Sequence, residues 1–128
     1  MTDQQWIAHP CLFLILAANN NVNGDVPNEI STLFTAERLG LFGNGLTSTI
    51  PSGISNLTSI IILDFENNFM DGVAIPESVR ELATLEGLFF SRNVFTGSIP
   101  QDIDRLSALT QFWVANNDIQ GTLPTTLG

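Results

Sequence analysis

The segment LFFSRNVFTGSIP, from Leu88 to Pro100, decides the fold, because its pattern of apolar residues, asparagine, glycine and proline recurs along the chain. An aliphatic residue followed by proline returns at nearly constant intervals, and the prolines of this series are Pro27, Pro51, Pro76, Pro100 and Pro124. Self-similarity at a fixed period, here about 24 residues, is typical of solenoid and propeller proteins. The chain is therefore expected to consist of stacked copies of one unit.

Two further columns of residues repeat in step with the prolines. The asparagine column comprises Asn20, Asn44, Asn68, Asn93 and Asn117. Four positions later comes a small residue: Gly24, Ser48, Gly72, Gly97 or Gly121. Apolar residues alternate before each asparagine, as in Leu39-x-Leu41-x-x-Asn44, which indicates a short strand with one buried face. After each proline they come every third position, as in Ile54, Leu57 and Ile60, which predicts a short helical or 3₁₀ turn with one buried stripe.

These motifs resemble the plant-type leucine-rich repeat, L-x-L-x-x-N-x-L-x-G-x-I-P, from about Trp6 to Leu127. The resemblance implies an α/β solenoid: a right-handed coil of about five 24-residue repeats, with a parallel concave β-sheet and short helical or 3₁₀ convex segments. Similar family members lie in receptor-like kinases, receptor-like proteins and secreted inhibitors, where they bind ligands or partner proteins. The resemblance therefore implies a non-enzymatic recognition module, extracellular or at the cell surface, that binds a peptide, glycan or protein. An intracellular scaffold that joins two proteins is the alternative.

The asparagine column is expected to be structural. Each side chain turns inward after a strand, where its amide can satisfy backbone groups of its own and adjacent coils, and a buried amide left unpaired would cost about 1 to 3 kcal/mol. The glycine column supplies backbone freedom for the next turn. Because Ser48 replaces glycine there, an ordinary φ is predicted at that position.

The two ends depart from the repeat. In the first coil, residues 6–29, Trp6 and His9 stand where the next coil has Ile30 and Leu33, and the last coil is incomplete. Family members usually begin with a cysteine-paired cap, and Cys11 has no partner cysteine. We therefore expect residues 1–128 to form one leucine-rich repeat domain that is a fragment of a longer array, with further repeats, a transmembrane helix or a kinase domain outside the chain.

Composition excludes several other classes. Thirteen acidic residues against four arginines and no lysine give a net charge of −9, which argues against a nucleic-acid partner or contact with an anionic membrane. The longest apolar run, from Leu12 to Ala18, is too short to cross a bilayer. One histidine and one cysteine cannot complete a zinc site, and no cofactor is expected.

The outward positions of the concave strands are the candidate ligand-binding surface. The first outward column is Leu16, Gly40, Asp64, Phe89 and Trp113. The next two are Ala18, Phe42, Glu66, Ser91, Ala115 and then Asn19, Gly43, Asn67, Arg92, Asn116. Aromatic side chains supply contact area and charges supply selectivity, so the ligand-binding residues are predicted to be Phe42, Asp64, Glu66, Phe89, Arg92 and Trp113. Five strands span about 19 Å, enough for an extended peptide of about six residues.

Other functions find weaker support in the sequence. Asp64 and Glu66 share a strand face and could form a catalytic carboxylate pair, but a shallow open sheet is expected to leave both acids solvated, with no raised pKa. His9 and Cys11 could suggest a nucleophile and a base, although Pro10 separates them. An ice-binding lattice needs a regular row of threonine or asparagine, which the outward columns lack. Asn56-Leu57-Thr58 is a glycosylation sequon on the convex segment, and Asn56 is the candidate acceptor.

Overall fold

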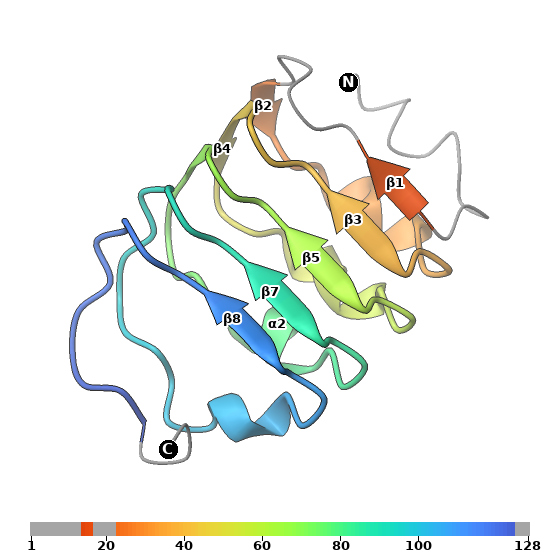
Figure 1. Ribbon diagram of the computed structural model, residues 1–128. Coiled ribbons are helices and arrows are strands. Elements are labelled where there is room, and N and C mark those ends of the chain that lie inside the picture. Colours follow the sequence, from red (N-terminus) through yellow and green to blue (C-terminus); the bar gives the residue numbers. More distant parts are fainter. Residues whose placement is uncertain (1–13, 17–22, 125–128) are drawn as a thin grey trace.

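The computed structural model describes residues 14–16 and 23–124, and its main feature is a five-stranded parallel sheet on one side of a curved coil (Figure 1). Its strands pair in chain order, one from each turn of the coil. They are β1 (Leu14–Leu16), β3 (Arg38–Gly40), β5 (Ile62–Asp64), β7 (Gly87–Phe89) and β8 (Gln111–Trp113). The predicted α/β solenoid with a parallel sheet is confirmed.

A second, smaller parallel sheet lies beside the first, and the sequence does not predict it. It comprises β2 (Asn23–Asp25), β4 (Gly45–Ser48) and β6 (Phe69–Met70). In the first sheet Leu39 pairs with Leu63, its equivalent in the next repeat. In the second sheet Thr47 pairs with Phe69 and not with its own equivalent, Asp71, so the register is offset from the repeat. A bridge between Val73 and Thr96 continues the same lateral face.

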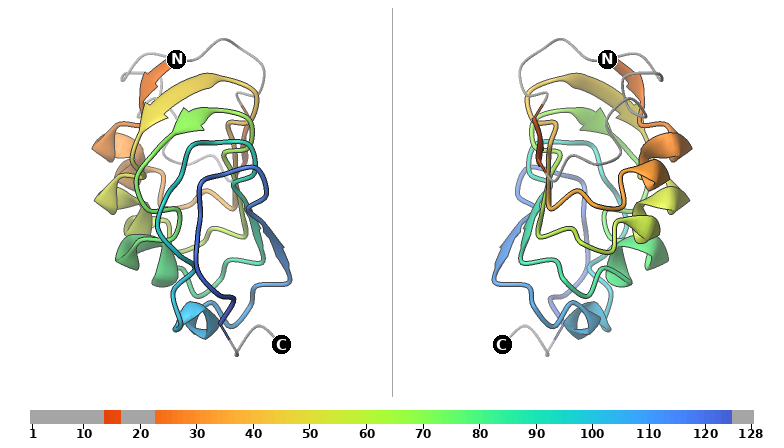
Figure 2. Two further views of the ribbon diagram at one scale, coloured as in Figure 1. Left: turned by 90° about the vertical axis from the view of Figure 1, so that its left-hand side faces the viewer. Right: turned by 90° about the vertical axis from the view of Figure 1, so that its right-hand side faces the viewer.

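Short helical segments cover the side of the coil opposite the five-stranded sheet (Figure 2). They are η1 (Asn28–Thr32), η2 (Ser52–Asn56), α2 (Glu77–Arg80) and η3 (Ile103–Arg105). The period of three predicted from sequence is confirmed, because the backbone N–H of Leu57 donates to the carbonyl of Ile54 and the N–H of Ile60 to that of Leu57. Each of these three apolar side chains is fully buried.

The core is one continuous cluster between the concave sheet and the convex segments. Leu39, Leu63 and Leu88 are register partners on successive strands, and all three are fully buried. A run of phenylalanines crosses the later coils, with ring centroids 5.7 Å apart for Phe65 and Phe90 and 5.3 Å for Phe90 and Phe95. The leucine contacts and the Phe65–Phe90 contact hold each coil against its neighbour, because a single coil cannot bury its own apolar stripe.

The asparagine amides tie each coil to the one before it. The Asn68 Oδ1 accepts a hydrogen bond from the N–H of Leu46 at 3.0 Å, and its Nδ2 donates to the carbonyls of Leu41 and Phe65, both at 3.0 Å. Asn93 repeats this arrangement one coil later, and Asn117 repeats it again. Each amide therefore bonds backbone groups in two coils. Asn20 lies outside the described residues.

The prediction of an ordinary φ at Ser48 is wrong. Ser48 has a φ of 68°, in the left-handed region, as do the glycines at the equivalent positions Gly24, Gly72, Gly97 and Gly121. The stacking of the coils imposes this conformation on the turn, and the serine adopts it in spite of its Cβ, which makes left-handed backbone unfavourable for residues other than glycine.

Candidate functional site

The first outward column of the concave sheet aligns as predicted. Backbone pairing places Leu16 beside Gly40, Gly40 beside Asp64, Asp64 beside Phe89 and Phe89 beside Trp113. The strands therefore present an acid and two aromatics side by side on neighbouring coils. Gly40 is buried, Asp64 and Phe89 are half-buried, and Trp113 is exposed.

Phe89 and Trp113 form an aromatic pair on β7 and β8. Their ring centroids are 5.2 Å apart and the ring planes meet at 86°, an edge-to-face geometry that aromatic side chains favour. Gly87 makes room for this pair: a Cβ there would lie 2.8 Å from the Phe89 ring. Trp113 keeps 56% of its surface exposed, so the pair offers aromatic surface to a ligand.

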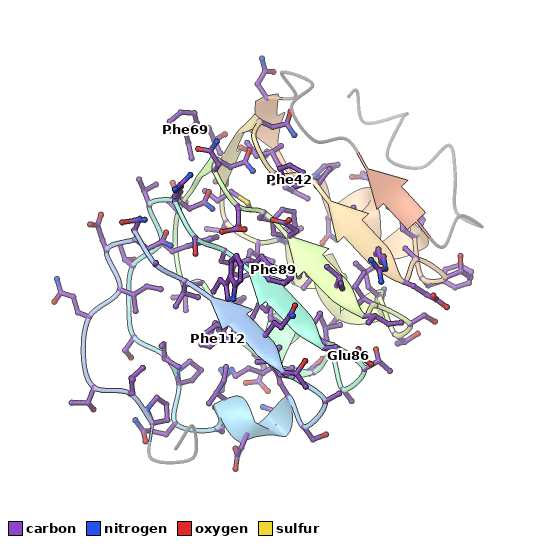
Figure 3. All side chains as sticks on the ribbon, viewed as in Figure 1. Phe42, Phe69, Glu86, Phe89 and Phe112 are labelled. Atoms are coloured by element: carbon purple, nitrogen blue, oxygen red, sulfur yellow. The ribbon has the colours of Figure 1, made fainter. Side chains whose placement is uncertain are left out.

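Four of the predicted residues line one depression beside the aromatic pair. Phe42, Asp64, Glu66 and Arg92 surround an open cavity of about 350 Å³, and Asn67 completes its lining. The residues come from three successive coils, at and just beyond the ends of β3, β5 and β7. Figure 3 shows Phe42 beyond the end of β3 and Phe89 on β7. Since Asp64 is the register partner of Phe89, the depression adjoins the aromatic pair.

The expectation that both acids are solvated is wrong for Asp64. Burial raises the pKa of the Asp64 carboxyl above its ordinary value. The backbone N–H of Glu66, which donates to the Asp64 Oδ1 at 3.0 Å, lowers this pKa, and the charge of the Glu66 side chain raises it. The carboxyl lies in a depression that Phe42 and the turn residues Asn67 and Arg92 also line, and not on an open sheet surface.

The third outward column consists of turn residues, not strand residues. Gly43, Asn67, Arg92 and Asn116 have φ values of 71°, 57°, 60° and 58°. Glycine and asparagine tolerate this left-handed backbone better than other residues, and the long side chain of Arg92 is the exception. In the described part of the chain, Arg92 makes no ion pair within 4.0 Å, unlike Arg80 and Arg105 on the convex side.

Sequence reasoning misses two contributors to this surface. Asn67 lines the depression, whereas the sequence predicts it only as an outward position, and Gly87 lies under the Phe89 ring. A signal for Asn67 is present, because asparagine, glycine and asparagine occupy three of the four described positions of that column. The sequence gives no signal for Gly87, because the need for a glycine at this position depends on the orientation of the Phe89 ring.

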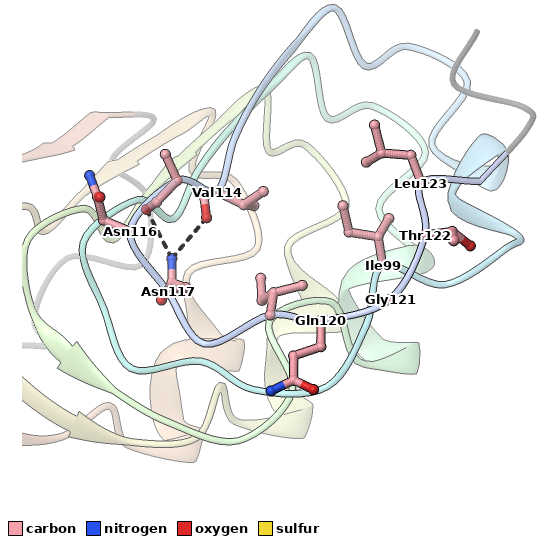
Figure 4. A pocket seen from close by; sticks show the side chains of 10 residues that line it. Ile99, Val114, Asn116, Asn117, Gln120, Gly121, Thr122 and Leu123 are labelled. Atoms are coloured by element: carbon pink, nitrogen blue, oxygen red, sulfur yellow. Dashed lines mark hydrogen bonds between the residues drawn. The ribbon is translucent and has the colours of Figure 1, made fainter.

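A second depression, of about 300 Å³, lies at the β8 edge of the coil (Figure 4). Ile99, Val114, Ile119 and Leu123 line it together with the Asn117 amide, which donates to the carbonyls of Val114 and Ala115. Ile99, Val114 and Ile119 occupy the inward positions of the repeat. We therefore assign this depression to coil stacking and not to ligand binding.

One remaining candidate, the acceptor of the glycosylation sequon, lies away from the concave surface. Asn56 is exposed in η2, on the convex side, where a glycan would meet solvent. His9, Cys11, Ala18 and Asn19 lie outside the described residues. Within residues 14–16 and 23–124, no group of three or more histidine, cysteine, aspartate or glutamate side chains could hold a metal ion. No helix in the same ranges is long and apolar enough to span a membrane.

The stacked coils, their asparagine ladder and the concave parallel sheet define a leucine-rich repeat protein. The Leucine Rich Repeat family profile matches residues 36–57, and the chain belongs to this family in its plant-type form. Among curated proteins, receptor-like protein 32 of Arabidopsis thaliana is 33% identical over 119 residues. That match covers 92% of this chain but only 13% of the relative, so the chain spans about an eighth of that protein's length.

Solved structures place the chain among plant repeat proteins. The leucine-rich repeat ectodomain of the Arabidopsis thaliana receptor kinase GASSHO1/SCHENGEN3, in complex with CASPARIAN STRIP INTEGRITY FACTOR 2, superposes with a TM-score of 0.90 at 28% identity, over 98% of this chain and 15% of that one. The plant peptide hormone receptor RGFR1 in complex with RGF2 gives 0.80 at 30% identity, over 84% and 17%. A plant ice-binding protein gives 0.84 at 29% identity, over 92% and 38%.

Proposed function

We propose that the chain is a non-enzymatic recognition module in the extracellular region of a receptor-like or secreted protein, and that it binds a peptide segment on its concave face. The observation that carries the proposal is the contiguous surface made by the Phe89–Trp113 pair and the adjoining depression. Tryptophan and arginine, both present on this surface, are among the residues that contribute most of the binding energy at protein interfaces. A peptide hormone receptor with the same fold lends further support.

A peptide fits this surface better than a catalytic substrate does. The depression is open and holds two carboxylates and one guanidinium, with no histidine, cysteine or serine among its lining residues. An extended peptide rises about 3.3 Å per residue, so about six residues would cross the five strands. Its apolar side chains would lie on the aromatic pair, and its polar groups would reach the charged depression.

The test is binding of fluorescein-labelled hexapeptides from a positional-scanning library, measured by fluorescence anisotropy. Trp113→Ala is expected to weaken binding of the selected pools about thirtyfold or more, since truncating an interface aromatic costs about 2 kcal/mol or more. Phe69→Ala is the matched control, because Phe69 is 63% exposed but lies on β6, in the second sheet. If no pool binds, or if the two variants weaken binding equally, the concave recognition surface is refuted.

Extracellular placement has its own test. Expression of the full-length gene product in plant cells is expected to give a glycosylated protein, whose electrophoretic mobility increases when Asn56→Gln removes the exposed sequon. Recovery of an unglycosylated protein from the cytosol would instead support the intracellular scaffold.

Ice binding is a second candidate function, because a plant ice-binding protein shares the fold. The described residues of the first outward column, Gly40, Asp64, Phe89 and Trp113, make no regular row of hydroxyl or amide groups. We expect no thermal hysteresis in a freezing-point assay of the purified chain. A clear hysteresis would make the lattice surface the primary function.

A further inference from the structure

We infer that the depression between Phe42 and Arg92 is a subsite for a basic side chain, lysine or arginine, of the bound peptide. This inference rests on the proposed function and specifies the chemistry of its ligand. It also predicts the order of the ligand's residues, because the basic side chain must lie next to the one that contacts Phe89 and Trp113.

The acids of the depression are not paired with its arginine. Asp64, Glu66 and Arg92 line the same cavity, yet among the described residues no ion pair within 4.0 Å joins Arg92 to either acid. Two acids against one arginine leave the depression with a net charge of −1, and the whole chain carries −9. A ligand group of positive charge is therefore electrostatically complementary to this cavity.

Asp64 is the residue best placed to receive that group. Its Oδ1 accepts the Glu66 N–H, so one oxygen is held by the backbone and the carboxylate orientation is fixed. The same carboxyl is half-buried, and burial raises its pKa, which is the sign of an incompletely compensated charge. An ammonium or guanidinium in the cavity would supply the missing compensation and form a charge-assisted hydrogen bond.

Phe42 and Asn67 favour an organic cation over a metal ion. Phe42 is 38% exposed and lines the cavity, where a ring beside a cation adds a cation–π attraction. Asn67 also lines the cavity, and its side-chain amide could offer an oxygen to a donor there. Calcium needs six to eight oxygen ligands, more than the oxygens of two carboxylates and one amide provide, and the Arg92 guanidinium would repel it.

Arg92 sets the limit of the subsite. Its cationic side chain repels a second positive charge, so the subsite takes one basic residue and disfavours a run of them. Since Asp64 and Phe89 are direct register partners, the basic residue should lie within about two positions of the aromatic or aliphatic residue that contacts Phe89 and Trp113.

The test uses the same hexapeptide library with native protein, Asp64→Asn and Glu66→Gln. Pools with one fixed lysine or arginine are expected to bind native protein about tenfold more tightly than the matched glutamine pools, and Asp64→Asn should remove most of that preference. Glu86→Gln is the control of equal charge change, because Glu86 is exposed just before β7 and does not line the cavity. Folding of each variant is checked by circular dichroism, and Asn can keep the hydrogen bond from Glu66 N–H.

The outcomes separate the two proposals. If binding depends on Trp113 but shows no preference for basic pools, or if Asp64→Asn and Glu86→Gln reduce the preference equally, the basic subsite is refuted while concave recognition stands. If no pool binds, the proposed function fails with it. A preference for pools with several adjacent basic residues would also contradict the subsite, since long-range attraction to the acidic chain would then explain it.

Discussion

Replacing Asn68 by alanine should destabilise the protein by about 3 to 5 kcal/mol, because this amide is a node between coils. The substitution removes the partner of the buried Leu46 N–H and three donated hydrogen bonds, to the carbonyls of Leu41, Phe65 and Glu66. The Leu41 carbonyl still accepts from Asn44, and the Phe65 carbonyl from Asn93. The principal penalty is therefore the orphaned N–H, about 1 to 3 kcal/mol, and the lost donated bonds and the cavity together add about 2 kcal/mol, because the Leu41 and Phe65 carbonyls each keep another donor.

Asn117→Ala is the matched comparison, because Asn117 makes the same kind of bonds but is only half-buried. Water can replace the amide there, so a cost of about 1 to 2 kcal/mol is expected. Urea denaturation followed by far-ultraviolet circular dichroism gives both free energies of unfolding. Equal costs for the two variants, or a cost below about 1 kcal/mol for Asn68→Ala, would refute the role of the amides as buried links between coils.

Three further predictions concern single positions. Ser48→Gly should stabilise the protein by about 0.5 to 1 kcal/mol, since relief of the left-handed backbone exceeds the added entropy of the unfolded chain, and a lower urea midpoint would contradict this. Thr47→Gly, at an exposed position of β4 with no such backbone, should destabilise the protein instead. Arg92→Asn should raise stability by about 0.5 to 1 kcal/mol, because asparagine tolerates the left-handed backbone better, and a lower melting temperature would show that the arginine is not strained. The same variant should bind peptides with adjacent basic residues less unfavourably than native protein does. The raised folded-state pKa of Asp64 favours folding below the ordinary carboxyl pKa, and this contribution is lost as pH rises through the raised pKa. Asp64→Asn should therefore be more stable than native protein at pH 7, and this gain in stability should shrink toward acid pH. A gain that stays the same in urea titrations at a series of pH values would disprove the assignment.

The sequence predicts the features that recur and misses those set by one local environment. Alternating leucines, the asparagine column and the period of three predict the concave sheet, its register and the convex turns, because each feature is repeated in several coils and reinforces the others. The second sheet is missed because its register departs from the repeat: Thr47 pairs with Phe69 instead of its repeat equivalent, Asp71. A repeat of constant length gives no sign of that offset.

The same limit applies to the site. Register from sequence places Asp64, Phe89 and Trp113 side by side, but it does not tell which outward residues share a cavity. That grouping depends on the left-handed turns after the strands, which bring Asn67 and Arg92 beside Phe42. The left-handed conformation also makes the prediction for Ser48 wrong, because coil geometry dominates over the residue's own preference.

Two residues of the depression are unfavourable for folding, and this supports its assignment as a binding site. Arg92 has left-handed backbone where the other coils have glycine or asparagine, and Asp64 is a half-buried carboxyl with a raised pKa. Strained backbone and incompletely compensated charge gather at functional sites, because a ligand supplies the interaction that the protein alone lacks. The convex side shows the opposite arrangement: there Arg80 and Arg105 are paired with Glu77 and Asp102. If Asp64→Asn and Arg92→Asn each stabilise the chain and each alter peptide selection, the native residues reduce stability at this depression but contribute to recognition. That combination is expected of a ligand-binding site and not of a depression formed only by coil stacking.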